Sequence, residues 1–135
     1  MAVQFSVAVR NARLDAIETQ IGTSAVLKIR TGAAPANCAA ADTGTVLATL
    51  NLPSDYLAAA SSGTKAKTGT WQDTSADNTG TAAHWRLYAS DGTTCGAQGT
   101  CTATGGGGDL ELDSTSITAA QQVTITSWTF TDGNA

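Results

Sequence analysis

The chain has 135 residues, of which 41% are hydrophobic and only 13% charged, and its net charge is −4 at pH 7. This length predicts one domain over residues 1–135, large enough to fold without a metal or a disulfide. The acidic balance, without clustered Lys and Arg, argues against a nucleic-acid partner. No apolar run is long enough to span a membrane. Met1–Phe5 lacks the basic start and long apolar core of a secretion signal, so we expect synthesis in the cytoplasm.

Residues 6–21 are predicted to form the one helix of the chain. Ser6 can cap its start and Gly22 can end it. The expected apolar stripe consists of Val7, Leu14, Ile17 and Ile21, and it is broadened by the flanking residues Phe5, Val9, Ala12 and Ala16. Arg10 and Arg13 lie in the first half of the helix, an order that opposes the helix dipole. Two interpretations stay open: a solvated polar face, or Arg10 and Arg13 as a partner-binding pair that meets an acidic surface.

Between residues 25 and 131 the chain reads as short strands separated by turns rich in Gly, Asn, Asp and Ser. The clearest strand is 82–89, and the dipeptide Asp91–Gly92 predicts a hairpin turn into the next strand, 95–104. Side chains of the first strand point two ways: Ala83, Trp85, Leu87 and Ala89 to one face, His84, Arg86 and Tyr88 to the other. Segment 55–60 fits either a helical turn or an extended run.

About seven or eight strands at regular spacing are typical of a sandwich or barrel. The predicted fold class is therefore all-β and mainly antiparallel. Its expected form is a β-sandwich over 25–131, compatible with a jelly roll, with the single α-helix in front of it. The chain has no alternation of strands and helices, which argues against a parallel sheet.

The three cysteines are Cys38, Cys95 and Cys101, and an odd number argues against a complete disulfide framework. Cys95 and Cys101 can face each other across a short hairpin and oxidise after release from the cell. We favour the alternative that they are reduced residues of the core or loops. No second cysteine pair or histidine cluster indicates a zinc site.

No catalytic motif is legible. His84 is the only histidine, and although Asp73, Asp77 and Asp91 allow a triad to be drawn, the Gly-x-Ser-x-Gly motif is absent. We therefore expect His84 at the surface or in an interface. The Gly105–Gly108 run lacks the Lys-Ser/Thr ending of a phosphate loop and indicates a tight turn. The prediction is a protein that is not an enzyme and has no cofactor.

Two further groups permit a binding role. Asp109, Glu111 and Asp113 alternate along a strand and share one side. They fit either a calcium site or a charged edge that discourages strand aggregation. The three tryptophans, Trp71, Trp85 and Trp128, permit a sugar-binding surface, but we favour core packing for at least two of them.

Several strings of the chain resemble a family of small proteins of tailed bacteriophages and prophages. The strings are Ala8–Ser24, Leu27–Gly32, Thr70–Asp73, Gly105–Asp109, Asp113–Ile117 and Thr131–Asn134. The resemblance covers essentially the whole chain and rests on distinctive strings rather than on a chemical signature.

The resemblance implies a virion component, and the small β-domain resembles capsid cement proteins. Such a protein binds the outer surface of the assembled capsid and stabilises it. The expected partners are the major capsid protein and further copies of the chain in a dimer or trimer. A surface poor in Lys and Glu is easily covered by a partner. The expected location is the capsid surface of the virion. The alternative is a tail or neck component, including a sugar-binding adhesion module.

Overall fold

The structure is a computed structural model that describes residues 2–133. One helix, α1 (Val7–Ile21), precedes eleven short strands. The strands are β1 (Val26–Arg30), β2 (Val46–Asn51), β3 (Thr64–Ala66), β4 (Trp71–Asp73), β5 (Gly80–Thr81), β6 (His84–Tyr88), β7 (Cys95–Ala103), β8 (Leu110–Leu112), β9 (Ser116–Ile117), β10 (Val123–Ile125) and β11 (Thr129–Thr131). The prediction of a mainly β chain with an N-terminal helix is confirmed.

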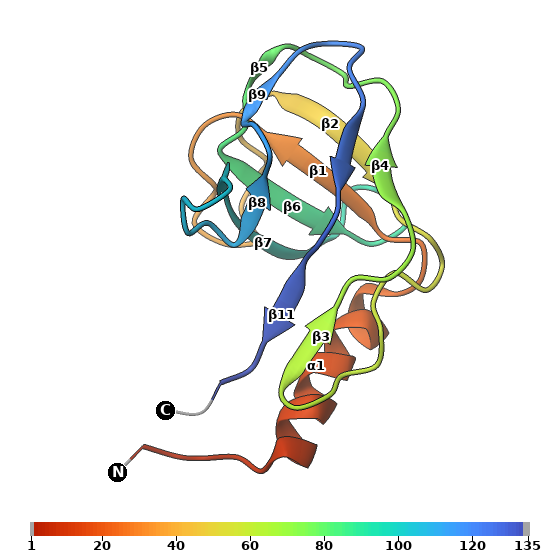
Figure 1. The fold of residues 1–135 in the computed structure, drawn as a ribbon, viewed down its shortest axis with the longest axis vertical. Coiled ribbons are helices and arrows are strands. Elements are labelled where there is room, and N and C mark those ends of the chain that lie inside the picture. Colours follow the sequence, from red (N-terminus) through yellow and green to blue (C-terminus); the bar gives the residue numbers. More distant parts are fainter. Residues whose placement is uncertain (1, 134–135) are drawn as a thin grey trace.

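One curled sheet dominates the architecture, in the order β2-β1-β6-β7-β8 (Figure 1). Three strand pairs, β10–β4, β11–β3 and β5–β9, stand apart from that sheet. Every pairing is antiparallel except β7–β8. The mainly antiparallel character is thus confirmed, and the parallel pair was not expected.

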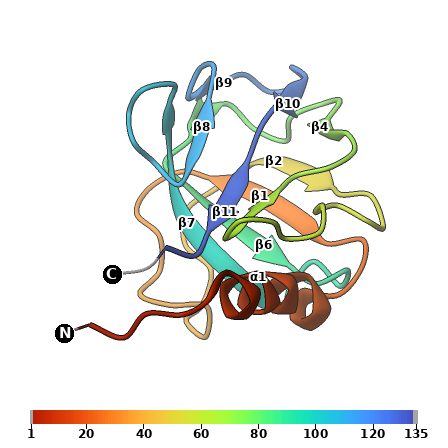
Figure 2. The same ribbon diagram turned by 60° about the horizontal axis from the view of Figure 1, so that its bottom comes forward.

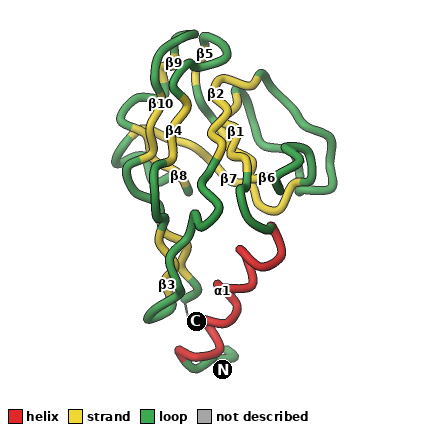
Figure 3. The backbone as a smooth tube through the Cα atoms, turned by 90° about the vertical axis from the view of Figure 1, so that its right-hand side faces the viewer, coloured by secondary structure: helices red, strands yellow, loops and turns green. Residues whose placement is uncertain are grey.

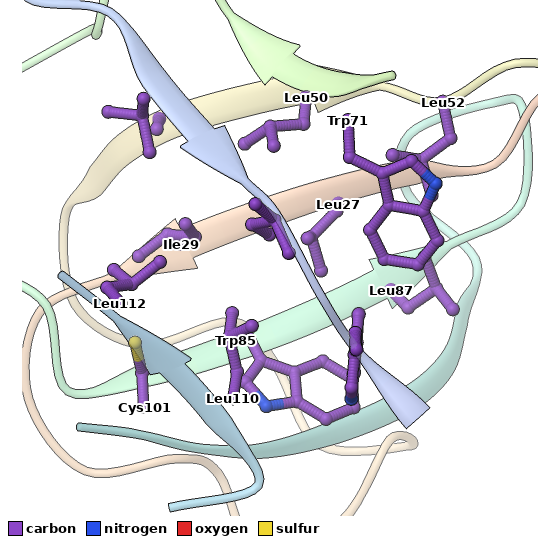
Figure 4. Packing of buried hydrophobic residues seen from close by; sticks show 14 of the residues in the cluster. Leu27, Ile29, Leu50, Leu52, Trp71, Trp85, Leu87, Cys101, Leu110 and Leu112 are labelled. Atoms are coloured by element: carbon purple, nitrogen blue, oxygen red, sulfur yellow. The ribbon is translucent and has the colours of Figure 1, made fainter. Parts of the chain in front are cut away.

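The core lies on the concave face of the curled sheet (Figure 4). Leu27 pairs with Leu87 and Ile29 with Trp85 across β1 and β6, so these apolar side chains share that face. Trp128 closes the core from the opposite side, with its ring centroid 4.5 Å from that of Trp85 in an edge-to-face arrangement. Residues from the sheet and from the separate strand pairs therefore fill one hydrophobic cluster.

The other face of β6 is also buried, which the alternating pattern did not predict. His84, Arg86 and Tyr88 lie on that face as expected, but the loop formed by residues 31–45 covers them. His84 is fully buried, and its Nδ1 lies 2.7 Å from the carbonyl oxygen of Gly32. The expectation of a surface or interface histidine is therefore wrong, because a distant loop replaces water over this face.

The glycine run closes the unexpected parallel pair. Residues 104–109 carry the chain from the end of β7 back alongside its last three residues, so that Leu110 pairs with Cys101. Gly105 and Gly107 have positive φ angles of 85° and 78°. A Cβ atom at Gly106 or Gly108 would come within 3 Å of Thr102. The run is thus a tight turn, as predicted, and it allows a connection much shorter than parallel strands usually need.

Helix α1 has the predicted bounds and caps. The Ser6 Oγ atom accepts a hydrogen bond from the Val9 N–H, and the Gly22 N–H donates to the Glu18 carbonyl at 2.8 Å. Of the predicted apolar stripe, only Leu14 and Ile21 are buried. The first turns of α1 lie beyond the curled sheet, beside β3 and β11 (Figures 1 and 3), which leaves Val7 exposed.

The cysteine prediction is wrong. Cys38, in the loop over β6, is bonded to Cys95 at the start of β7, and their Cα atoms are 5.3 Å apart. Cys101 is the free, buried thiol. Sequence proximity favoured Cys101 as the partner of Cys95, whereas the folded loop brings a residue 57 positions away. Segment 55–60 resolves as extended chain, with Leu57 bridging to Lys67.

Candidate interaction surface

An uncharged, exposed segment is the most distinctive surface feature of the described chain. Residues 2–9, here called the apolar arm, comprise an extended stretch and the first turn of α1, and none carries a charged side chain. Its exposed apolar side chains are Val3 (73%), Val7 (47%), Val9 (43%) and Phe5 (41%). Exposed apolar side chains gathered in one short, uncharged segment make that segment a candidate interaction site.

Arg10 and Arg13, the predicted partner-binding pair, both contact the C-terminal segment of the same chain. Arg10 donates to the Asp132 carbonyl at 3.0 Å, and Arg13 forms a 3.2 Å ion pair with the Asp132 carboxylate. The Arg13 guanidinium also lies 4.9 Å from the centroid of the Phe5 ring. Both arginines therefore tie the start of α1 to the end of β11, and Arg13 remains half exposed.

A buried lysine attaches the middle of α1 to the body. Lys65 of β3 forms ion pairs with Asp15 at 2.8 Å and Glu18 at 3.3 Å. Burial works against the charged ammonium, but the hydrogen bonds to both carboxylates outweigh it and raise the pKa of Lys65. The hydrogen bonds from Lys65 and from the Ala60 N–H lower the pKa of Asp15. This attachment fixes how α1 presents the apolar arm.

A groove runs along β7 near the same end of the molecule. Its first part is a hollow of about 470 Å³ between α1 and β7, with Ile17 and Ile21 on one wall. Its second part, about 430 Å³, lies between β7 and β11 and is lined by Trp85 and Trp128. The two hollows adjoin at Ala97 and Phe130, which line both, and together they are here called the β7–β11 groove.

His84 does not lie beside the aspartates with which it could have formed a catalytic triad. The Asp73 carboxylate accepts hydrogen bonds from the Thr49 and Ser75 amides, and Asp77 accepts from the Thr49 hydroxyl. Asp91 accepts from Thr93 and Thr94 in the β6–β7 turn, and these bonds lower its pKa to about 2. These aspartates organise local backbone, and His84 lies under the 31–45 loop instead of beside them.

The row of carboxylates also binds its own chain. Asp109 accepts from the Thr100 amide and hydroxyl, each at 2.9 Å. Glu111 accepts from the Gly105 and Gly107 amides at 3.1 Å, so the amides of the glycine turn hold a carboxylate. Among residues 2–133, no group of three or more His, Cys, Asp or Glu side chains is placed to hold a metal ion.

All three tryptophans are buried, in agreement with the preference for core packing. Trp71 donates its indole N–H to the Thr68 carbonyl at 3.1 Å. The Trp85 indole N–H, by contrast, has no hydrogen-bond partner within the described chain. A sugar-binding surface needs an exposed aromatic ring, and none of Trp71, Trp85 and Trp128 provides one.

Comparisons with known proteins found no match to a protein-family model, to a curated protein or to a solved structure. Within the part of the chain that the structure describes, no helix combines the length and the apolar character needed to cross a bilayer.

The apolar arm was missed at the sequence level although its signal is visible there. Val3, Phe5, Val7 and Val9 recur at every second position in a stretch without charge. Val7 was assigned to the apolar stripe of the helix, with Phe5 and Val9 flanking it, whereas all three are exposed. The period of two fits an extended chain better than a helix, although Val7 and Val9 lie in α1; the absence of charge is what sets the segment apart in the sequence.

Proposed function

We propose that the protein is a non-enzymatic structural subunit of a tailed-phage virion, a cement protein that binds the assembled capsid and stabilises it. The resemblance of its strings to phage proteins provides the virion context. The observation that carries the proposal is the apolar arm, an uncharged and exposed segment on an otherwise well-packed β-domain. An assembly subunit needs such a surface. Among the described residues, His84 and the aspartates Asp73, Asp77 and Asp91 are not arranged for catalysis.

The amount of exposed apolar surface fits an assembly contact. The exposed fractions of Val3, Phe5, Val7 and Val9 together equal about two complete side chains, worth on the order of 3–6 kcal/mol if a partner covers them. Part of that is lost to the cost of association. Modest contacts of this size become strong when the symmetry of a capsid repeats them.

We also propose that the fold is a form of β-sandwich. The curled sheet would be one layer, and the pairs β4–β10 and β3–β11 would form a broken second layer across the core. The contact between Trp85 on the sheet and Trp128 beside β11 supports this description. A jelly-roll connectivity is the finer form of the same proposal.

Arg10 and Arg13 take a modified role in this proposal. Through Asp132 and Phe5 they orient the apolar arm at one end of the molecule. The half-exposed Arg13 guanidinium also lies where it can meet an acidic residue of the major capsid protein. The two arginines would thus act on partner binding mainly by positioning the arm.

Electron cryo-microscopy of purified virions tests the proposal. We expect density for the protein on the capsid surface. Particles that lack the protein should release their DNA at a lower temperature, as followed by a dye-accessibility melt. Adding back the wild-type protein should restore the heat resistance.

Two results would contradict the cement role. One is density confined to the tail or neck, which would favour the alternative location. The other is a capsid that carries the protein but melts at the same temperature without it.

A further inference from the structure

We propose that the apolar arm of one copy lies in the β7–β11 groove of a second copy, where it adds a strand to the open edges of β7 and β11. The inference rests on the proposed role as an assembly subunit and identifies the surface that joins two copies. Its test uses the isolated protein, so it can fail while the capsid assignment holds.

The arm and the groove complement each other in polarity. The arm carries no charged side chain between residues 2 and 9. The shared floor of the groove is formed by Ala97 and Phe130, which are only partly buried in one copy. In its own copy the arm runs away from the body (Figure 2), and Val3 is 73% exposed. One chain therefore carries a segment with exposed apolar side chains and a groove that is mainly apolar between α1 and β7 and mixed in polarity between β7 and β11.

The edge of β7 that borders the groove has unused main-chain groups. The Cys101 N–H donates to the Ala83 carbonyl on the β6 side, so in an antiparallel pair the main chain of Gln98 and Thr100 faces the other way. On that side the Thr100 N–H is bonded to Asp109. The β7–β8 pairing covers only Cys101–Ala103. The Gln98 main chain is thus open to an added strand.

The facing edge of β11 is open as well. Trp128 accepts from the Lys67 N–H, and the Asp132 N–H donates to Gly63, so the main chain of Thr129 and Thr131 faces away from β3. Both threonines line the groove. An unpaired strand edge is a ready template for another strand.

A buried polar group beside the groove also lacks a partner within the described chain. Trp85 lines the hollow between β7 and β11, and its buried indole N–H has no acceptor within the described chain. Buried donors are nearly always satisfied in folded proteins. The main-chain carbonyls of an added strand could accept this hydrogen bond, whereas an apolar side chain has no acceptor to offer.

The geometry of the arm suits the site. Residues 2–5 are extended, and four extended residues span about 13 Å. The open Gln98 main chain and the Thr129–Thr131 edge both fall within that length. Val3 and Phe5 fall on the same face of an extended arm and can both face the apolar floor of the groove.

A second copy is the occupant that these features favour. Every copy supplies both an arm and a groove, so two copies can exchange arms through two equal contacts and form a closed dimer, and three can close a ring. A capsid protein would have to provide an unrelated apolar strand for the same groove.

Sedimentation velocity of the isolated protein provides the first test. We expect wild-type protein to self-associate. Val3→Asp should weaken this association about tenfold or more, because a carboxylate would replace an apolar side chain against Ala97 and Phe130. The matched control is Ala119→Asp, which adds the same charge at an exposed loop position away from arm and groove. A monomer at all concentrations, or equal association of Val3→Asp and wild type, would overturn the proposal.

Photo-crosslinking locates the contact. A benzophenone amino acid at position 3 is activated in a mixture of ¹⁵N-labelled and unlabelled protein, and the crosslinked peptides are sequenced by mass spectrometry. Crosslinks between copies to residues 96–98 or 129–131 support arm exchange. Crosslinks confined to the same copy, or between copies but to another region, reject it. A tail location of the protein would contradict the cement proposal but would not contradict arm exchange between copies.

Discussion

At the scale of single residues, Asp42 organises the polar side of β6. Its carboxylate pairs with Arg30 at 2.8 Å, accepts from the Tyr88 hydroxyl at 2.8 Å, and forms an ion pair with Arg86. Burial by itself would raise the pKa of Asp42, but the hydrogen bonds from Tyr88 and Arg86 and the two arginine charges outweigh it and lower that pKa. Two buried guanidinium groups thus depend on one carboxylate for charge compensation.

The substitution Asp42→Ala tests this dependence. We expect the free energy of unfolding to fall by about 3 kcal/mol, because Arg30 and Arg86 would be left buried without a counter-charge. Urea denaturation monitored by tryptophan fluorescence measures the change. Asp113→Ala is the control: it removes an exposed carboxylate and should change stability by less than about 0.5 kcal/mol. Equal effects of the two substitutions would mean that Asp42 does not compensate the arginines.

At the scale of elements, the loop of residues 31–45 acts as a cover for the outer face of the curled sheet. The disulfide between Cys38 and Cys95 attaches this loop to β7, and Gln98 donates to the Pro35 carbonyl at 2.6 Å next to it. Cysteines stay reduced in most cytoplasms and form disulfides in oxidising surroundings. We therefore expect the bond to form only where the protein meets oxidising surroundings.

Removal of the disulfide should loosen this cover. The double variant Cys38→Ala/Cys95→Ala should unfold about 2–4 kcal/mol more easily than oxidised wild type, because closing a loop constrains the unfolded chain. A reducing agent should destabilise wild type but not the double variant.

Thiol titration supplies the control. Burial raises the pKa of Cys101 to about 11, so this thiol should resist alkylation in the native state and be the single reactive thiol after unfolding without reductant. Three reactive thiols in unfolded, never-reduced protein would contradict the pairing.

At the scale of the whole molecule, stability should depend on pH at both extremes. Hydrogen bonds lower the pKa values of Asp15, Asp42 and Asp91 below the ordinary 3.8, that of Asp91 to about 2. A carboxyl group whose pKa is lower in the folded than in the unfolded state stabilises the fold fully above its unfolded-state pKa. This stabilisation is lost as the pH falls through the folded-state pKa. On the alkaline side, burial and the neighbouring Glu18 raise the pKa of Tyr56 from 10.0 to about 12, so its contribution is complete below pH 10.

We therefore expect a plateau in the melting temperature that ends near both limits. The melting temperature should fall as the pH drops from about 4 to 2, and again as it rises from about 10 to 12. Calorimetry across this range measures both limbs. Asp91→Asn should flatten the acid limb, whereas the alkaline limb should be unchanged. An acid limb of equal steepness in this variant would rule out Asp91 as a contributor.

Local chemistry was sufficient to predict much of this fold. The caps at Ser6 and Gly22, the turn at Asp91–Gly92 and the alternation along β6 each depend on residues a few positions apart. Such signals act through backbone geometry and nearest hydrogen bonds, so they are readable in the chain itself. They determined the helix, the β character and the faces of the clearest strand.

Only the tertiary structure decided what covers each face. The cover over His84 and the bond from Cys38 to Cys95 join residues 52 and 57 positions apart, and the parallel β7–β8 pair depends on a turn that folds back on its own strand. The exposure of the apolar arm follows from the position of α1 beside β3 and β11 (Figure 1). Burial is a property of all the elements packed around a residue, and no local pattern along the chain contains that information.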